Sequence, residues 1–229
     1  MHPVKPHSFP KAQFLRTSAQ IPVLRGEHNI YEDCEKMIEE RRSIRKFKKQ
    51  GVSKKYIDTI VDAARLAPSA KNRQPWKYVV YTGNGKNALL DVMEAALKKE
   101  QREHSLLPNS GFGLPDAFNT LRIMREAPVI IVVMNTNGQS PYEAIDADGR
   151  VMEICDSLSI GASIENMILK ATDIGLGTLW IANTCFAYND LVKYINEQGQ
   201  LIGAVAVGYA DEQPDQRPRK ALEDILEYK

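Results

Sequence analysis

The stretch VMEICDSLSIGASIENMILKATDIGLGTLWIA, residues 151–182, decides the fold class. Its apolar residues recur at spacings of three and four over residues 151–174, which predicts an α-helix. Ile154, Leu158 and Ile168 widen this apolar surface over most of the helix circumference. A helix of this kind must be buried on nearly all sides, so we expect it in the middle of the core or in a subunit interface.

A glycine turn follows the predicted helix and leads into a strand. Gly175 is suited to end the helix, and Gly177 allows the strand at residues 178–182 to start tightly. The turn is not a dinucleotide-binding G-x-G-x-x-G motif, because Trp180 stands where the third glycine would be. We therefore reject a Rossmann pyrophosphate site at this turn.

The rest of the chain alternates between predicted helices and strands, which indicates a mixed sheet flanked by helices and hence the α+β class. Helices are predicted at residues 31–41, 53–67, 86–99 and around 191–195, and strands at residues 76–81, 127–134, 178–182 and 201–209. The strand at 127–134, APVIIVVM, is continuously apolar, as expected of a central strand covered on both faces. Residues 104–118 are rich in glycine and proline and predict a mobile loop or a lid.

Composition limits the class of protein. The chain has 229 residues, which suggests one domain over residues 31–229 after an arm at residues 1–30 that is flexible or packed on a partner. The arm is poor in acids, as transit peptides are, but its prolines weaken that reading. A net charge of +1 argues against a nucleic-acid-binding protein. The longest apolar run is too short to cross a bilayer, so no membrane partner is expected.

Cysteine usage favours a reducing compartment. The three cysteines, Cys34, Cys155 and Cys185, are far apart and form no C-x-x-C pair. This spacing does not suit a disulfide scaffold or a zinc site. We therefore expect a cytoplasmic protein without a bound metal.

A basic bend carries the first chemical signal. RRSIR at residues 41–45 places guanidinium groups around the hydroxyl of Ser43, a set that suits the bidentate binding of a phosphate. The alternative is that these cations complement the dipole at a helix C-terminus, which contributes less than about 1 kcal/mol. Taken alone, the bend is better explained by this alternative.

Two further segments carry weaker signals of the same kind. The turn APSAKNRQPW, residues 67–76, groups compact polar side chains but is also an ordinary turn sequence. The basic segment DQRPRKALEDI, residues 215–225, holds Arg217, Arg219 and Lys220 but is also an ordinary solvated tail.

Together, the order of these segments resembles the nitroreductase family of FMN-dependent oxidoreductases. The resemblance extends from about Cys34 to the C-terminus and is carried by RRSIRKF, APSAKNRQPWKYVV, GASIENMILKATDIGLGTLWI and AVAVGYADEQPDQRPRKAL. It implies an intertwined α+β homodimer with two FMN sites at the subunit interface. It also implies an interpretation of the basic bend, whose anion would be the FMN phosphate.

The resemblance assigns cofactor-binding residues to four groups. The phosphate and ribityl chain would be bound by Arg41, Arg42, Ser43 and Arg45, and the phosphate site would be completed by Arg217 and Arg219. The flavin would be reached from the other subunit by Pro68, Ser69, Ala70 and Asn72. The flavin ring would lie beside Ile181, Ala182 and Asn183. NTCFAYND, which begins at Asn183, departs from family members that have glycine near the ring. The departure leaves the backbone donor to the flavin open.

The implied activity is hydride transfer from NADH or NADPH through the flavin to an electron-poor acceptor, such as a nitroaromatic, quinone or enone, in a ping-pong cycle. The flavin carries the chemistry, so no catalytic side chain is assigned. Alternatives are dehalogenation, flavin cleavage or a non-catalytic flavin-binding protein. We expect Arg45, Lys71 or Arg73 to supply positive charge near the flavin, and Phe112 and Phe118 to cover the substrate. Cys185 is either a redox-sensitive thiol or a small buried residue.

Overall fold

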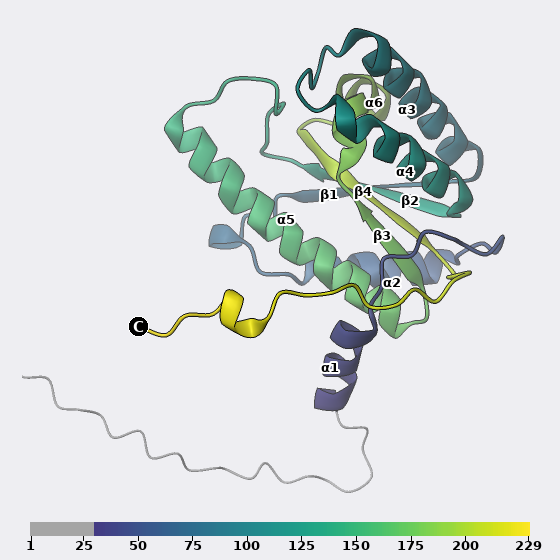
Figure 1. Ribbon diagram of the computed structural model, residues 1–229, viewed down its shortest axis with the longest axis vertical. Helices are drawn as coiled ribbons and strands as arrows, with labels where there is room; N and C mark the ends of the chain where they lie inside the picture. Colours follow the sequence, from purple (N-terminus) through teal and green to yellow (C-terminus); the bar gives the residue numbers. More distant parts are fainter. Residues whose placement is uncertain (1–29) are drawn as a thin grey trace, which may run out of the picture.

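A four-stranded sheet forms the centre of the computed structural model, which describes residues 30–229 (Figure 1). The strands are β1 (Trp76–Thr82), β2 (Val129–Asn135), β3 (Gly177–Ile181) and β4 (Gln200–Gly208), in the order β1-β2-β4-β3. All three neighbouring pairs are antiparallel, so the sheet is antiparallel where a mixed sheet was expected. Among the described residues, parallel pairing is limited to an isolated bridge between Ser43 and Thr178. The α+β class is confirmed. The predicted arm lies outside the described residues, except for Ile30.

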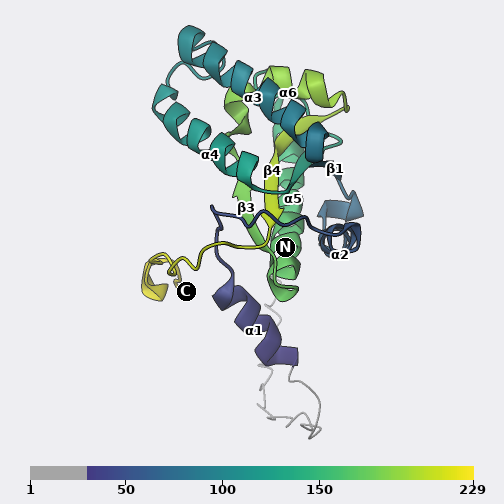
Figure 2. The same cartoon turned by 90° about the vertical axis from the view of Figure 1, so that its right-hand side faces the viewer.

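Helices cover both faces of the sheet (Figure 2). The covering helices are α2 (Lys54–Arg65), α3 (Gly83–Glu103), α4 (Leu114–Glu126), α5 (Ala147–Asp173) and α6 (Tyr188–Ile195). Helix α1 (Ile30–Glu40) extends away from the sheet and contacts α5 (Figure 1). One apolar core joins α3, α4 and α6 to one face, and a second core joins α2 and α5 to the other. Within the described residues, no helix is both long and apolar enough to cross a bilayer.

Strand β2 connects the two cores. Every one of its residues is buried. Because successive side chains of a strand point to opposite faces, Ile130 and Val132 pack in the first core while Ile131 and Val133 pack in the second. The prediction of a central strand covered on both faces is therefore confirmed.

Helix α5 starts earlier than predicted and ends as predicted. The Asp146 side chain caps its N-terminus by accepting a hydrogen bond of 2.7 Å from the Gly149 backbone N–H. At its end, Gly175 has φ +77°, and the backbone N–H of Leu176 donates to the Ala171 carbonyl at 2.8 Å. This is a Schellman motif, which requires the left-handed conformation that glycine adopts without strain.

Helix α5 is apolar on both sides, but the single chain buries only one of them. Ile160, Ile164 and Met167 are fully buried. Val151, Met152, Ile154 and Leu158 are exposed, with Leu158 at 71%. The expectation of burial on nearly all sides is therefore not met within one chain.

The predicted loop at 104–118 is shorter than expected, because α4 already begins at Leu114. Leu114, Ala117 and Leu121 lie on one helical face and are buried in the first core. Their spacing, with Pro115 in the first turn, is the helical signal that the glycine-rich context obscured. Of the two phenylalanines expected to cover the substrate, Phe112 is 87% exposed, whereas Phe118 packs against the first core.

The start of this loop is held by a buried carboxylate. Glu100 is 2% exposed and accepts hydrogen bonds from the backbone N–H groups of Ser105, Leu106 and Leu107 at 3.0–3.1 Å. Burial alone opposes ionisation, but these hydrogen bonds and the Ser105 hydroxyl together lower the pKa of Glu100 below its usual value. Glu100 therefore stabilises the fold in its ionised form.

This arrangement predicts a pH-dependent contribution to stability. The contribution of Glu100 is complete above its unfolded-state pKa of about 4.3 and is lost as the pH falls through the lower folded-state pKa. Glu100→Gln should reduce the free energy of unfolding by about 1–3 kcal/mol near neutral pH. Urea unfolding should show this difference shrinking toward about pH 3. Glu103→Gln, at an exposed position of the same helix, is the control, and a difference independent of pH would contradict the assignment.

Candidate functional site

The basic bend lies along the outer edge of β3. The Ile44 backbone N–H donates to the Thr178 carbonyl at 2.8 Å, and Ser43 forms its parallel bridge at the same position. The Ile44 side chain is buried against Gly177, where an added Cβ would lie 2.8 Å from Ile44 Cγ1. The absence of a side chain at Gly177 therefore allows the bend to approach the strand.

The C-terminal tail pairs with the next residues of the same segment (Figure 1). The Lys48 N–H donates to the Tyr209 carbonyl, and the Asp211 N–H donates to the Lys46 carbonyl, each at 2.9 Å. Phe47 forms an antiparallel bridge with Ala210 between them. Residues 43–48 are thus held by β3 and by the tail, and two segments far apart in the sequence, residues 46–48 and 209–211, lie side by side.

A small cavity of about 90 Å³ lies where these segments meet, and we call it the arginine cradle. Its lining includes Arg41, Arg42, Ser43, Arg45, Arg217 and Arg219, together with one carboxylate, Asp215. The fold therefore brings together all six residues that the sequence assigned to a phosphate from opposite ends of the chain. Five guanidinium groups with a single carboxylate leave a positive excess that suits a phosphate.

Three of the arginines also have structural partners. Arg42 Nη1 donates to the carbonyls of Glu39 and Arg41 at the end of α1, so it fulfils the helix-end role given by the alternative reading. Arg41 Nε lies 3.7 Å from Glu165 Oε1 on α5. Arg45 Nη1 donates to the Ser43 carbonyl at 3.0 Å, which orients its guanidinium along the bend.

A second cavity of about 250 Å³ adjoins the arginine cradle, since Arg45 lines both. One wall comes from β3 and the turn after it, residues 179–183. The other wall comes from α4 through Asp116, Asn119, Thr120 and Ile123. The sequence reading placed Ile181, Ala182 and Asn183 here but missed the residues of α4, because it treated Asp116 as part of a loop.

Asn183 presents an unpaired acceptor in the wall of this second cavity. Its Nδ2 donates to Asp116 Oδ2 at 3.1 Å and to Thr120 Oγ1 at 2.9 Å. A carboxylate can only accept, so the amide orientation is fixed, and Oδ1 is left buried without a partner among the described residues. Such an acceptor costs about 1–3 kcal/mol, so a ligand or a water that donates to it would stabilise the site.

The turn at residues 68–72 lies away from both cavities of the same chain. The Ala70 N–H donates to Ser159 Oγ on α5 at 3.2 Å, and the Gln74 N–H donates to Ser69 Oγ at 3.0 Å. One chain therefore does not bring Pro68, Ser69, Ala70 and Asn72 to the arginine cradle.

The same turn is strained. Lys71, Asn72 and Gln74 all have positive φ angles, of 54°, 54° and 49°. Non-glycine residues in this region cost of the order of 1 kcal/mol each and are concentrated at functional sites. Arg73, by contrast, is committed to Asp156, with its Nη2 at 2.7 Å from Oδ1, and this hydrogen bond raises the pKa of Arg73.

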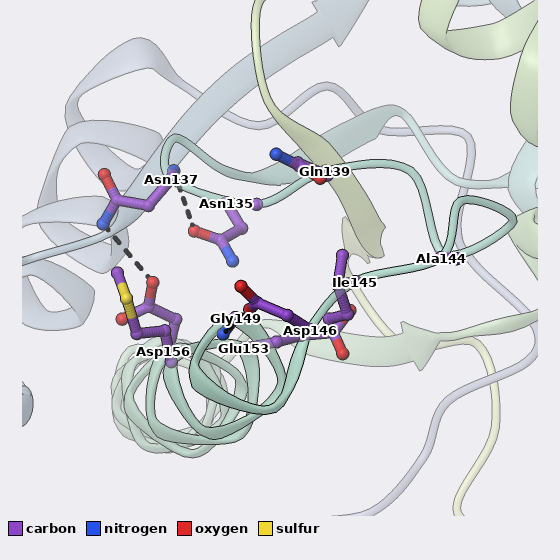
Figure 3. Close-up of a pocket in the computed structure, with 11 residues that line it drawn as sticks. Asn135, Asn137, Gln139, Ala144, Ile145, Asp146, Gly149, Glu153 and Asp156 are labelled. Atoms are coloured by element: carbon purple, nitrogen blue, oxygen red, sulfur yellow. Dashed lines mark hydrogen bonds between the residues drawn. The ribbon is translucent and has the colours of Figure 1, made fainter.

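A third cavity, of about 350 Å³, lies between the end of β2, the connection at 136–146 and the start of α5 (Figure 3). Its carboxylates already have partners within the chain. Asp146 caps α5, Glu153 accepts from Gln200 at 3.0 Å, and Asp156 binds Arg73 and Asn137. No residue of the predicted site lines this cavity. We interpret it as a region where polar side chains hold the connection against α5.

Cys185 is half-buried beside the second cavity. Burial raises the pKa of its thiol above the usual value, which disfavours the reactive thiolate. Its carbonyl accepts a hydrogen bond of 2.8 Å from the Tyr142 hydroxyl, and burial raises the pKa of Tyr142 to about 12. These contacts favour the reading of Cys185 as a small buried residue.

The family model of the nitroreductase family matches residues 38–209, which include the basic bend, the strained turn and β3. The chain belongs to the nitroreductase family. The match ends before Arg217 and Arg219, so the family model does not include them, and it is the structure that places them in the arginine cradle.

Individual nitroreductase relatives agree over most of the chain. A protein of Archaeoglobus fulgidus assigned as an NADH dehydrogenase/NAD(P)H nitroreductase is 28% identical over 80% of this chain and 89% of its own length. The crystal structure of a nitroreductase-like family protein from Bacillus cereus is 26% identical with a TM-score of 0.65, covering 85% and 95% of the two chains. A BluB-like flavoprotein from Clostridium difficile gives the same identity and TM-score, covering 85% and 97%.

The close approach at Gly177 yields a test of how the site is supported. Gly177→Ala would place a Cβ 2.8 Å from Ile44 Cγ1 and 3.2 Å from the Ala210 Cβ, so both the bend and the tail must shift. We expect a loss of about 1–3 kcal/mol in the free energy of unfolding, measured with urea. Gly51→Ala, where an added Cβ meets nothing within 4 Å, is the control and should show no loss. Equal stability of the two variants would contradict this packing.

Proposed function

We propose that this nitroreductase is an FMN-dependent homodimeric oxidoreductase that uses NADH or NADPH to reduce an electron-poor acceptor such as a nitroaromatic, a quinone or an enone. One observation carries the proposal: arginines from near both ends of the described chain line one cavity, and β3 lines a second cavity that shares Arg45 with it. We call the two adjoining cavities the groove. A phosphate at one end and a flat ring at the other is the shape of a flavin mononucleotide.

The residues present fit FMN. Arg41, Arg45, Arg217 and Arg219 would bind its phosphate, and the unpaired Oδ1 of Asn183 would accept from an N–H of its ring system. When bound, FMN supplies the two-electron chemistry, so no catalytic side chain is assigned. The chain's own residues hold the cofactor and orient it, with Asp116 and Thr120 fixing the Asn183 amide.

A second copy of the chain would complete the site. The groove has an open side next to Trp180, which is 45% exposed, and an added Cβ at Gly161 on α5 would lie 3.9 Å from that indole. The exposed apolar face of α5 lies on the same helix, and the strained turn at 68–72 packs on α5 through Ser159. Packing of two copies through α5 would bury this face and could bring the turn of one copy to the groove of the other.

The tail supports the same assembly. Leu222, Ile225, Leu226 and Tyr228 are all exposed in the single chain. Apolar side chains gathered in one short segment are more stable when a partner surface covers them. We therefore include the tail in the proposed interface, with the second copy as its partner.

Flavin binding and reduction test the activity. The purified protein should bind FMN, and anaerobic addition of NADH or NADPH should remove the visible absorbance of the bound flavin. Arg217→Ala/Arg219→Ala should weaken FMN binding at least about tenfold, since hydrogen bonds to charged groups contribute about 1.5–3 kcal/mol each. Lys49→Ala removes a cation from the same region without lining the arginine cradle, and it should bind normally.

The outcomes separate the rival functions. Protein that binds no FMN would contradict the proposal. A flavin that is bound but inert to both nicotinamides would favour a non-catalytic binding protein. Consumption of the reduced flavin itself in the presence of oxygen would favour flavin cleavage.

The assembly has its own test. Leu158→Arg places a charge in the middle of the exposed apolar face of α5, where burial in an interface would be strongly unfavourable. We expect this variant to be monomeric by light scattering while the unmodified protein is dimeric. Asn189→Arg, on the exposed side of α6, should remain dimeric. A dimer that tolerates Leu158→Arg would place the interface elsewhere.

A further inference from the structure

Glu212 joins the two halves of the arginine cradle. Its Oε1 accepts a hydrogen bond from the backbone N–H of Arg45 and another, of 3.2 Å, from that of Lys46. The carboxylate thus reaches across 167 positions of sequence to the segment that carries the N-terminal arginines. Glu212 itself belongs to the tail that carries Arg217 and Arg219.

Its position along the tail makes this contact decisive. The backbone pairing between the tail and the bend ends at Asp211, whose N–H donates to the Lys46 carbonyl. Beyond Glu212, the hydrogen bonds of the described tail join tail residues to each other, as from Arg219 to the Arg217 carbonyl and from Asp224 to the Ala221 carbonyl. Glu212 is therefore the last described residue of the tail that is hydrogen-bonded to the rest of the chain.

The residues that follow Glu212 limit how far the two tail arginines can move from the bend. Pro214 and Pro218 have fixed φ angles, which restrict the paths available between Glu212 and the two arginines. Without the anchor, the tail could leave the bend at Asp211, and the two pairs of arginines would no longer face one site.

We propose that Glu212 is a positioning residue for phosphate binding: it holds the N-terminal and C-terminal arginines in one site and thereby sets the affinity for the phosphate of FMN. This inference rests on the proposed function. It concerns a residue that does not line the arginine cradle and whose hydrogen bonds, within the described residues, come from backbone N–H groups.

Electrostatics alone makes the opposite prediction. Glu212 is a carboxylate near a site for an anion, so removal of its charge should strengthen phosphate binding if charge repulsion were its main effect. Positioning predicts weaker binding when the hydrogen bonds are lost. The sign of the change therefore separates the two explanations.

The experiment compares FMN with riboflavin, which lacks the phosphate, on the full-length protein freed of flavin. Glu212→Ala should weaken FMN binding about tenfold and leave riboflavin binding within about twofold of the unmodified protein. Glu212→Gln keeps an acceptor oxygen and should bind FMN at least as tightly as the unmodified protein. Glu223→Ala removes an exposed carboxylate farther along the tail and is the matched control.

A second variant, Glu212→Asp, keeps the test decisive if Glu212→Ala does not fold. Glu212→Asp keeps the charge but loses one methylene of reach, so weaker FMN binding by this variant also supports positioning. Unchanged or tighter FMN binding by Glu212→Ala would overturn the inference, and so would an equal loss of affinity for FMN and riboflavin. In either case the proposed function would still stand, provided that the unmodified protein binds FMN. If the unmodified protein bound no FMN, the proposed function would fail and this inference with it.

Discussion

The site depends on backbone pairing that holds residues 43–48 between β3 and the beginning of the tail. Five guanidinium groups repel one another, so they cannot assemble a cavity by themselves. Hydrogen bonds between neutral backbone groups supply the framework. The Ile44 N–H donates to the Thr178 carbonyl, and the Asp211 N–H donates to the Lys46 carbonyl. The repulsion that remains when the site is empty is what an anionic ligand would relieve.

The same framework explains why the site needs so little side-chain chemistry. Two apolar cores hold the sheet in place. Strand β3 belongs to this sheet, pairs with the bend and leads into the turn that carries Asn183, so it positions both. Helix α4 then orients Asn183 through Asp116 and Thr120. A rigid scaffold of this kind suits a protein that positions a reactive cofactor and leaves the chemistry to it.

Sequence patterns predicted the elements well where one periodicity dominated. The apolar run of β2 and the helical spacing of α5 both appear in the structure. The pattern misled at Leu114, because nearby glycines and prolines are typical of loops although helix α4 begins there. That error hid Asp116 and Thr120, whose relevance depends on their distance from Asn183.

By itself, the sequence determined the α+β class, the central strand and the long helix, because local periodicity is written along the chain. The candidate phosphate residues came from the resemblance of its motifs to the nitroreductase family. Only the tertiary structure brought Arg41 and Arg45 together with Arg217 and Arg219, and revealed Glu212 between them. It also divided α5 into a buried and an exposed face. These features are distances between remote segments, and they are set by the packing of the sheet and its helices.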